Sequence, residues 1–263
     1  MIYREVMLMK TLSLYQEKNT VIHRIDPISK LFYILAAIVI PIIIPERTIA
    51  LICLLFSACL LILGRVFRKV LPIVSFSLIV LLSIIVIQGL FKAENKTVLF
   101  NIGFLIFYKE GLMYALDICI RVLNILFAFS ILVLTTKPSD LIESLVRRGM
   151  SPRIGYVLSS VLQIIPQMTS TMGTIMDAQR SRGMETEGKL IVRIKAFFPL
   201  IGPVVMSSLT NTRERAMALE VRGFNSRNSK TFLNEEKYSS HNKIMRLVLI
   251  LLIIFAVIWR IIL

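Results

Sequence analysis

The chain is poor in acidic residues and in the residues that usually carry catalysis or bind metals. Asp and Glu together number 16 against 31 Lys and Arg, and the 263 residues include only two histidines, three cysteines and one tryptophan. The three cysteines (Cys53, Cys59 and Cys119) lie in apolar runs, and their odd number and spacing exclude a disulfide framework or zinc site. The sequence also contains no Gly-rich phosphate loop, HExxH motif or nucleophile elbow. We therefore expect neither catalysis nor a bound cofactor or metal.

Apolar residues dominate the composition instead. They make up 56% of the chain, with a mean hydropathy of +0.76, whereas soluble domains are about 45–50% apolar. The net charge of +15 would suit nucleic acid. However, the basic residues alternate with long apolar runs and gather in particular loops, which is the pattern of membrane topology. The sequence thus predicts a membrane protein and argues against nucleic-acid binding.

Five apolar runs are candidates for membrane spans, because a spanning helix needs about 20 apolar residues. They lie at 31–44, 49–63, 71–91, 112–134 and 245–263. Pro41 and Pro45 are expected to close the first run, and Pro72 to open the third. The predicted organisation is a leader (1–30), a four-span region (31–135), a long polar region (136–224), a polar linker (225–244) and a C-terminal span (245–263). The expected fold class is therefore an all-α polytopic membrane protein.

Lysine and arginine in the short loops predict the orientation. Five of them precede the first span, and the loop 64–69 adds three more. On the other side, the turn after the first span has only Arg47, and the three lysines of 92–110 are diluted by two glutamates. The N-terminus is expected in the cytoplasm and the C-terminus outside, which places 136–224 in the cytoplasm.

The polar region 136–224 is expected to form long amphipathic helices. Apolar residues recur every third or fourth position over 154–180, a helical spacing that we expect to bend or break near Pro166. The stretch 196–206 is apolar but only about half a span long, so we expect it to pack rather than cross the membrane. A further helix then runs to Gly223.

Both of these helices are expected to end in an Arg-Gly pair. The pairs are Arg182-Gly183 and Arg222-Gly223. Helix capping alone explains one such pair, since arginine complements the helix dipole and glycine adopts the left-handed cap. A repeated pair favours a second role, because exposed guanidinium groups bind carboxylates of a partner well.

These residues resemble a known family, the transmembrane T components of energy-coupling factor transporters (EcfT/CbiQ family), which belong to prokaryotic vitamin and metal importers. The family carries Ala-Arg-Gly or Ala-Arg-Ser motifs at the ends of two cytoplasmic coupling helices. The matching residues here are Ser181, Arg182 and Gly183, and Val221, Arg222 and Gly223. Further similar segments are HRIDPISK (23–30), GFLIFYKEGL (103–112) and LTTKPSDLIESL (134–145), in the family's order. Serine and valine replace the usual alanine in the two motifs.

The resemblance implies a coupling role in the cell membrane. Two cytosolic ATPase subunits, which bind ATP and Mg, would move on ATP binding, and the coupling helices would transmit this motion to a small integral membrane S component. Arg182 and Arg222 would each pair with acidic side chains of one ATPase. The substrate, a vitamin, metal or other micronutrient, would be chosen by the S component.

Methionines on the coupling helices are candidates for the S-component contact. Met168, Met172, Met176 and Met206 are adaptable side chains that suit a surface able to repack. Ordinary packing within the chain explains them equally well.

Asp117 and Arg121 are ionisable residues inside the fourth predicted span, spaced i and i+4. We interpret them as a structural pair that fixes helix packing. Charges within a membrane are functional by default, which leaves an ion-coupled secondary transporter as one alternative. A conventional ABC importer permease is another, although it would use one coupling helix rather than two Arg-Gly ends.

Overall fold

The computed structural model describes residues 15, 18, 20–91, 97–102, 105–183, 190–226, 231–232 and 240–262. Its contacts divide the chain into two units. The membrane unit holds the described residues up to Ser144 and those from Ser240 onward. The helix-pair unit holds the described residues from Leu145 to Phe232.

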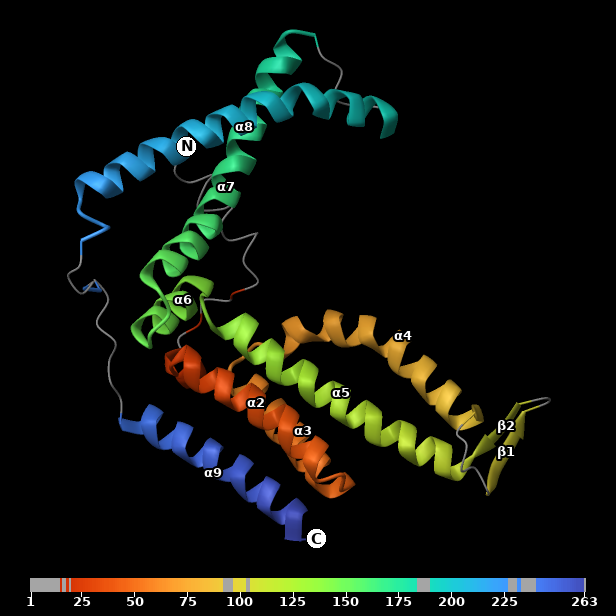
Figure 1. Cartoon of the computed structure of the whole chain (residues 1–263). Coiled ribbons are helices and arrows are strands. Elements are labelled where there is room, and N and C mark those ends of the chain that lie inside the picture. Colours follow the sequence, from red (N-terminus) through yellow and green to blue (C-terminus); the bar gives the residue numbers. More distant parts are fainter. Residues whose placement is uncertain are drawn as a thin grey trace. The chain divides into compact units, whose positions relative to one another are not determined.

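Helix α5 is the centre of the membrane unit. It packs against α2, α3 and α4, and α9 packs along α2 (Figure 1). The elements are η1 (Val21–Arg24), α2 (Pro27–Ile43), α3 (Arg47–Leu63), α4 (Phe67–Phe91), α5 (Lys109–Thr135) and α9 (Ser240–Ile262). The arrangement lets the longest apolar helix bury its small residues, such as Ala115 and Ala128, against its neighbours.

The start of α2 follows from a local capping signal. The Asp26 carboxylate accepts a hydrogen bond from the backbone N–H of Ile28 at 3.3 Å, and Pro27 occupies the first helical position. Aspartate at the N-cap and proline at N1 both favour helix initiation. The helix therefore begins four residues before the predicted span.

Pro41 does not close this helix, so that prediction was wrong. α2 continues through Pro41 to Ile43. A proline lacks the N–H that would bond the carbonyl four residues earlier, which here is Ala37. Asn124 of α5 supplies the missing donor, since its side-chain Nδ2 donates to the Ala37 oxygen at 2.8 Å. A neighbouring helix thus satisfies the carbonyl that the proline leaves free.

The same asparagine joins α3. The hydroxyl of Ser57 lies 2.7 Å from Asn124 Oδ1, 2.7 Å from the hydroxyl of Tyr33 and 2.9 Å from the Cys53 carbonyl. Both Ser57 and Asn124 are fully buried. This buried network links α2, α3 and α5 and was not predicted.

One end of the membrane unit gathers segments that are distant in sequence. Lys18 Nζ donates to the Arg65 carbonyl at 2.6 Å, and Lys30 Nζ donates to the Thr135 carbonyl at 3.0 Å. The start of α9 lies here too, because the Ser29 hydroxyl lies 3.5 Å from the carbonyl of Asn242. The leader, the α3–α4 turn and the end of α5 therefore share one end, which we call the leader end.

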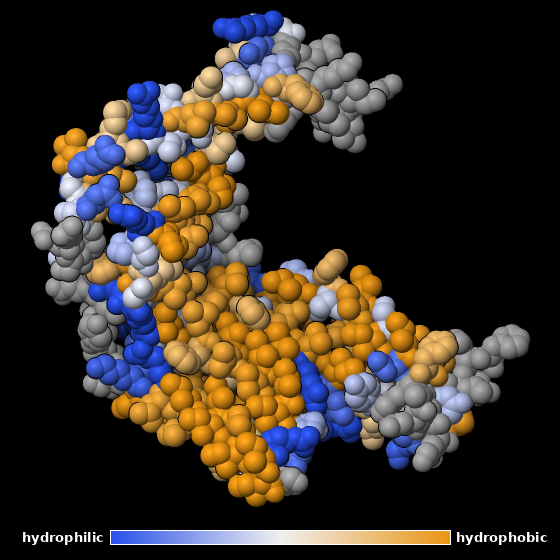
Figure 2. Space-filling model, viewed as in Figure 1, coloured by the Kyte–Doolittle hydropathy of each residue, from blue (hydrophilic) through white to orange (hydrophobic). Residues whose placement is uncertain are grey.

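The membrane unit has the surface of a protein embedded in lipid. Within the described part of the chain, three segments are long and apolar enough to cross a membrane, namely Phe67–Phe91, Lys109–Thr135 and Asn242–Ile262. α2 and α3 are shorter apolar helices of 17 residues, or about 26 Å. Figure 2 shows hydrophobic residues over much of this unit. The chain is a helical polytopic membrane protein, and five spans remain the prediction.

A β-hairpin replaces part of the loop expected between the third and fourth runs. β1 (Val98–Ile102) pairs antiparallel with β2 (Leu105–Tyr108). It lies against the end of α4, where a Cβ added to Gly89 would meet the Phe107 ring at 3.0 Å. Its β-branched and aromatic residues favour strands, a signal that the span-based interpretation overlooked.

The helix-pair unit consists mainly of two long helices. α6 (Pro138–Arg147) leads into α7 (Pro152–Ser181), and α8 (Leu190–Val221) follows. Of the bend or break expected near Pro166, the break does not occur, because α7 runs unbroken for 30 residues. α8 likewise continues through Pro199 and Pro203 for 32 residues.

Candidate functional site

The two Arg-Gly pairs form the C-caps of α7 and α8. Gly183 has φ +87° and Gly223 has φ +70°, both in the left-handed region. The Gly223 N–H donates to the Glu220 carbonyl at 2.9 Å, and the Phe224 N–H to the Leu219 carbonyl at 3.0 Å. These two bonds make a Schellman motif. The predicted capping role of both glycines is confirmed.

All six residues of the two motifs are exposed: Ser181, Arg182, Gly183, Val221, Arg222 and Gly223. A Cβ added to either glycine would have no atom within 4 Å. Among the described residues, the guanidinium groups of Arg182 and Arg222 make no hydrogen bond or ion pair with each other or with any other side chain. Both cations are therefore presented to the surroundings by helix ends that hold their backbone in place.

A third helix end has the same construction, and sequence analysis missed it. α6 ends before Arg148 and Gly149, and Gly149 has φ +110°. Its N–H donates to the Val146 carbonyl at 3.1 Å, and the Met150 N–H donates to the Leu145 carbonyl at 3.1 Å. The Arg-Arg-Gly letters at 147–149 were the available signal.

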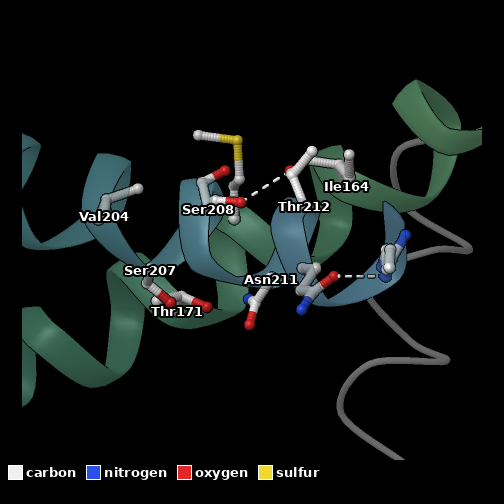
Figure 3. Close-up of a pocket in the computed structure, with 10 residues that line it drawn as sticks. Ile164, Thr171, Val204, Ser207, Ser208, Asn211 and Thr212 are labelled. Atoms are coloured by element: carbon white, nitrogen blue, oxygen red, sulfur yellow. Dashed lines mark hydrogen bonds between the residues drawn. The ribbon is translucent and has the colours of Figure 1, made fainter. Parts of the chain in front are cut away.

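α7 and α8 cross each other, as Figure 1 shows. The crossing holds a small recess lined by both polar and apolar side chains, among them Ile164, Val204, Ser208 and Asn211 (Figure 3). Arg215 Nη2 of α8 donates to Gln167 Oε1 of α7 at 2.9 Å. Near the end of α8, the rings of Phe224 and Tyr156 lie 5.4 Å apart.

These contacts place the two Arg-Gly ends far apart. Phe224, just beyond Gly223, lies beside Tyr156 in the first turns of α7, whereas Arg182 follows the last turn of that helix. About 26 residues of helix separate Tyr156 from Arg182, or roughly 39 Å. The two arginines cannot share one small ligand, but they can each enter a different protein.

The four methionines that were predicted to form one contact surface differ in their exposure. Met168 lines the recess between α7 and α8, and Met172 and Met176 are half-buried. Only Met206 is strongly exposed, at 68%. The exposed apolar face of α7 lies instead in its first half, at Ile154, Val157, Leu158, Val161, Leu162 and Ile165.

Asp117 pairs with Arg47 rather than with Arg121, so the predicted partner was wrong. Arg47 Nε donates to Asp117 Oδ1 at 2.6 Å and Arg47 Nη2 to Asp117 Oδ2 at 3.2 Å. This bidentate pair joins the start of α3 to α5, because helix packing brings the two turns together. Arg121 Nε is buried and has no hydrogen-bond partner among the described residues. Engagement of both Asp117 oxygens favours a structural role over an ion relay.

The described residues contain no group of three or more His, Cys, Asp or Glu side chains placed to hold a metal ion. The candidate site is the set of exposed Arg-Gly helix ends on the helix-pair unit.

Comparison with known proteins identifies the family of this chain. The model of the family described as "Cobalt transport protein" (CbiQ) matches residues 18–232. The energy-coupling factor transporter transmembrane protein EcfT of Lactococcus lactis subsp. cremoris is 28% identical over 260 residues, covering 93% of this chain and 96% of that protein. The EcfT of Streptococcus equi subsp. equi is 31% identical, covering 82% and 84%. That of Brevibacillus brevis is 29% identical, covering 94% and 96%. The chain belongs to the energy-coupling factor T-component family.

The family match includes both predicted Arg-Gly ends. It extends from Lys18 in the leader through both long helices to Phe232. The T-component family is a family of membrane transport proteins, so transport across a membrane is the general function of this chain.

Proposed function

We propose that this T component is the coupling subunit of an importer driven by ATP. Two cytosolic ATPase subunits would hydrolyse ATP, and this chain would carry their motion to a small membrane S component that binds a vitamin or a metal. The observation that supports the proposal best is the pair of exposed Arg-Gly ends, one just after the last turn of α7 and the other beside its first turns. That separation suits one ATPase subunit at each end.

Each arginine would bind its ATPase through carboxylates. A guanidinium group forms paired, parallel hydrogen bonds with a carboxylate, so the interaction is directional as well as electrostatic. The glycine that follows has open space around it, so a partner's surface can approach the helix end closely. Truncating one partner of a buried charge pair at an interface costs about 2–5 kcal/mol. A charge reversal at Arg182 or Arg222 should therefore weaken ATPase binding by about 30-fold or more.

The exposed apolar face of α7 and the neighbouring part of α8 would contact the S component. Phe198, Met206 and Leu209 of α8 are 71%, 68% and 60% exposed. They would add an apolar surface from α8 to the exposed apolar face of α7. This surface is more exposed than Met168, Met172 and Met176, which also belong to the proposed contact.

The proposed orientation puts the leader end of the membrane unit in the cytoplasm and the C-terminus outside. The leader and the exposed Arg65, Arg68 and Lys69 lie at that end, consistent with an excess of cationic residues on the cytoplasmic side. The protein would reside in the plasma membrane of a prokaryote.

Affinity purification from native membranes in mild detergent tests the proposal. Wild type is compared with Arg182→Glu, Arg222→Glu and the matched control Arg213→Glu, which reverses an exposed arginine within α8. We expect two ATPase subunits and a small membrane protein with wild type and with the control, and loss of the ATPases with either helix-end variant. Purification of the chain alone, or ATPases retained by both helix-end variants, would refute the coupling role.

A further inference from the structure

Lys30 is a buried lysine at the leader end of the membrane unit. Only 4% of its surface is exposed, although it lies in the second turn of α2. Its Nζ donates to the Thr135 carbonyl at 3.0 Å and to the Thr136 hydroxyl at 3.0 Å. Thr135 and Thr136 are themselves buried. A buried ammonium group is costly unless it is paired or bonded, so this position requires an explanation.

The two acceptors mark the carboxyl end of α5. Thr135 is the last residue of the helix and Thr136 its C-cap. The last carbonyl groups of a helix have no partner within it and carry the negative end of the helix dipole. The Lys30 ammonium group donates a hydrogen bond to one of these carbonyl groups and places a positive charge beside the negative end of the dipole.

Two carboxylates complete the surroundings of this charge. Asp26, the N-cap of α2, and Asp140, in the first turn of α6, both act on Lys30 electrostatically. Lys30 therefore interacts with the start of α2, the end of α5 and the start of α6. α6 begins at Pro138, only two residues after Thr136, and the helix-pair unit begins at Leu145.

We propose that Lys30 is a positioning residue that caps the carboxyl end of α5 and thereby fixes the α5–α6 junction, through which the helix-pair unit acts on the membrane unit. The second part rests on the proposed coupling function. A rigid junction transmits a displacement along the chain, whereas a loose one absorbs it by local rotation. Sequence analysis treated Lys30 only as one more leader cation.

Distances between spin labels test the junction directly. The labels are attached to cysteines at Ser83 of α4 and Ser139 of α6, both exposed and both in the membrane unit. The native cysteines are replaced beforehand. Lys30→Met keeps an unbranched side chain of nearly the same length but removes its charge and donors, and Lys69→Met is the matched control at an exposed lysine. The whole chain is purified with its co-purifying partners and measured before and after Mg-ATP with vanadate.

In wild type and Lys69→Met we expect one narrow distance distribution that shifts with nucleotide. In Lys30→Met we expect a broader distribution and loss of the nucleotide-dependent shift, while the ATPases are still retained through Arg182 and Arg222. The same width and the same shift in Lys30→Met as in wild type would overturn the inference. A mere loss of stability would not abolish the shift in a complex that still retains its ATPases.

A second variant covers the case in which Lys30→Met does not accumulate. Thr136→Val removes one acceptor and leaves the Thr135 carbonyl in place, so an intermediate width supports the role of Lys30 and a wild-type width contradicts it. If wild type retains no ATPase subunit, the proposed function fails. The comparison of widths without nucleotide then still decides whether Lys30 fixes the junction.

Discussion

Replacing Asn124 by leucine should destabilise the chain, because Pro41 then leaves a carbonyl of α2 without a hydrogen-bond donor. Leucine has the same number and branching of side-chain heavy atoms as asparagine, so the change removes hydrogen bonding with little change in shape. Ser57 keeps partners, because its hydroxyl still faces the Cys53 carbonyl and the Tyr33 hydroxyl. The Ala37 carbonyl does not, since its side-chain donor is lost and Pro41 has no N–H to offer.

The magnitude follows from that orphaned carbonyl. Leaving a buried acceptor unsatisfied costs about 1–3 kcal/mol, while hydrogen bonds between membrane helices average about 0.6 kcal/mol with a maximum near 1.7. Ala37 is only 5% exposed and Asn124 is fully buried, so we expect a loss of about 1–2 kcal/mol in the free energy of unfolding. In a chain of this size that corresponds to a fall in Tm of roughly 2–4 °C per kcal/mol.

Thermal unfolding in detergent, arranged as a double-mutant cycle with Pro41→Ala, measures the effect. Alanine restores the N–H at position 41, so Asn124→Leu should cost clearly less in the Pro41→Ala background than in wild type. Ser83→Ala is the control, because the hydrogen bond of the Ser83 hydroxyl, to the Ile79 carbonyl, stays within α4. An equal cost of Asn124→Leu in both backgrounds would refute the link between the asparagine and the proline.

Three further changes have expected outcomes in the same unfolding assay. Arg47→Met and Asp117→Asn should each cost about 1–3 kcal/mol, because each leaves the other charge unpaired in or beside a predicted span; the double variant should cost less than the sum, and strict additivity would argue against the pair. Gly223→Ala should destabilise the end of α8 by about 1 kcal/mol, since alanine resists the left-handed φ of +70°, and Gly223→Asn should cost less; equal effects would contradict this account. Gly155→Ala should cost about 1–3 kcal/mol because the added Cβ overlaps the Val146 side chain. The cost should be smaller in a Val146→Ala background, and an equal cost there would contradict this overlap as the cause.

Local chemistry was the part of the structure that sequence analysis could anticipate. The two Arg-Gly ends are determined by a glycine that accepts a positive φ within one turn of the helix, so Gly183 and Gly223 were found from their neighbours alone. The third end, at Gly149, carries the same signal and was simply not considered. The hairpin at 98–108 was missed because a search for long apolar runs gives short strands no weight.

The helix end predicted at Pro41 was wrong, and the helix does not break at Pro166, because the effect of a proline depends on its surroundings. In isolation Pro41 ends a helix and Pro166 breaks one, since each removes a backbone donor. In the folded chain Asn124 replaces the donor lost at Pro41, and α7 continues through Pro166 to Ser181. No property of residues 37–45 alone indicates that an asparagine 87 residues away from Ala37 supplies that bond.

The sequence by itself determined that this chain enters a membrane and how two of its long helices end, because hydropathy and capping act over a few residues. Only the tertiary structure decided which charges and polar groups meet. Arg47 lies 70 residues from Asp117, and Lys30 lies 105 from Thr135. Helix packing creates these neighbours, and it also sets the distance between Arg182 and Arg222, because that distance depends on how α7 and α8 cross rather than on the residues at either end.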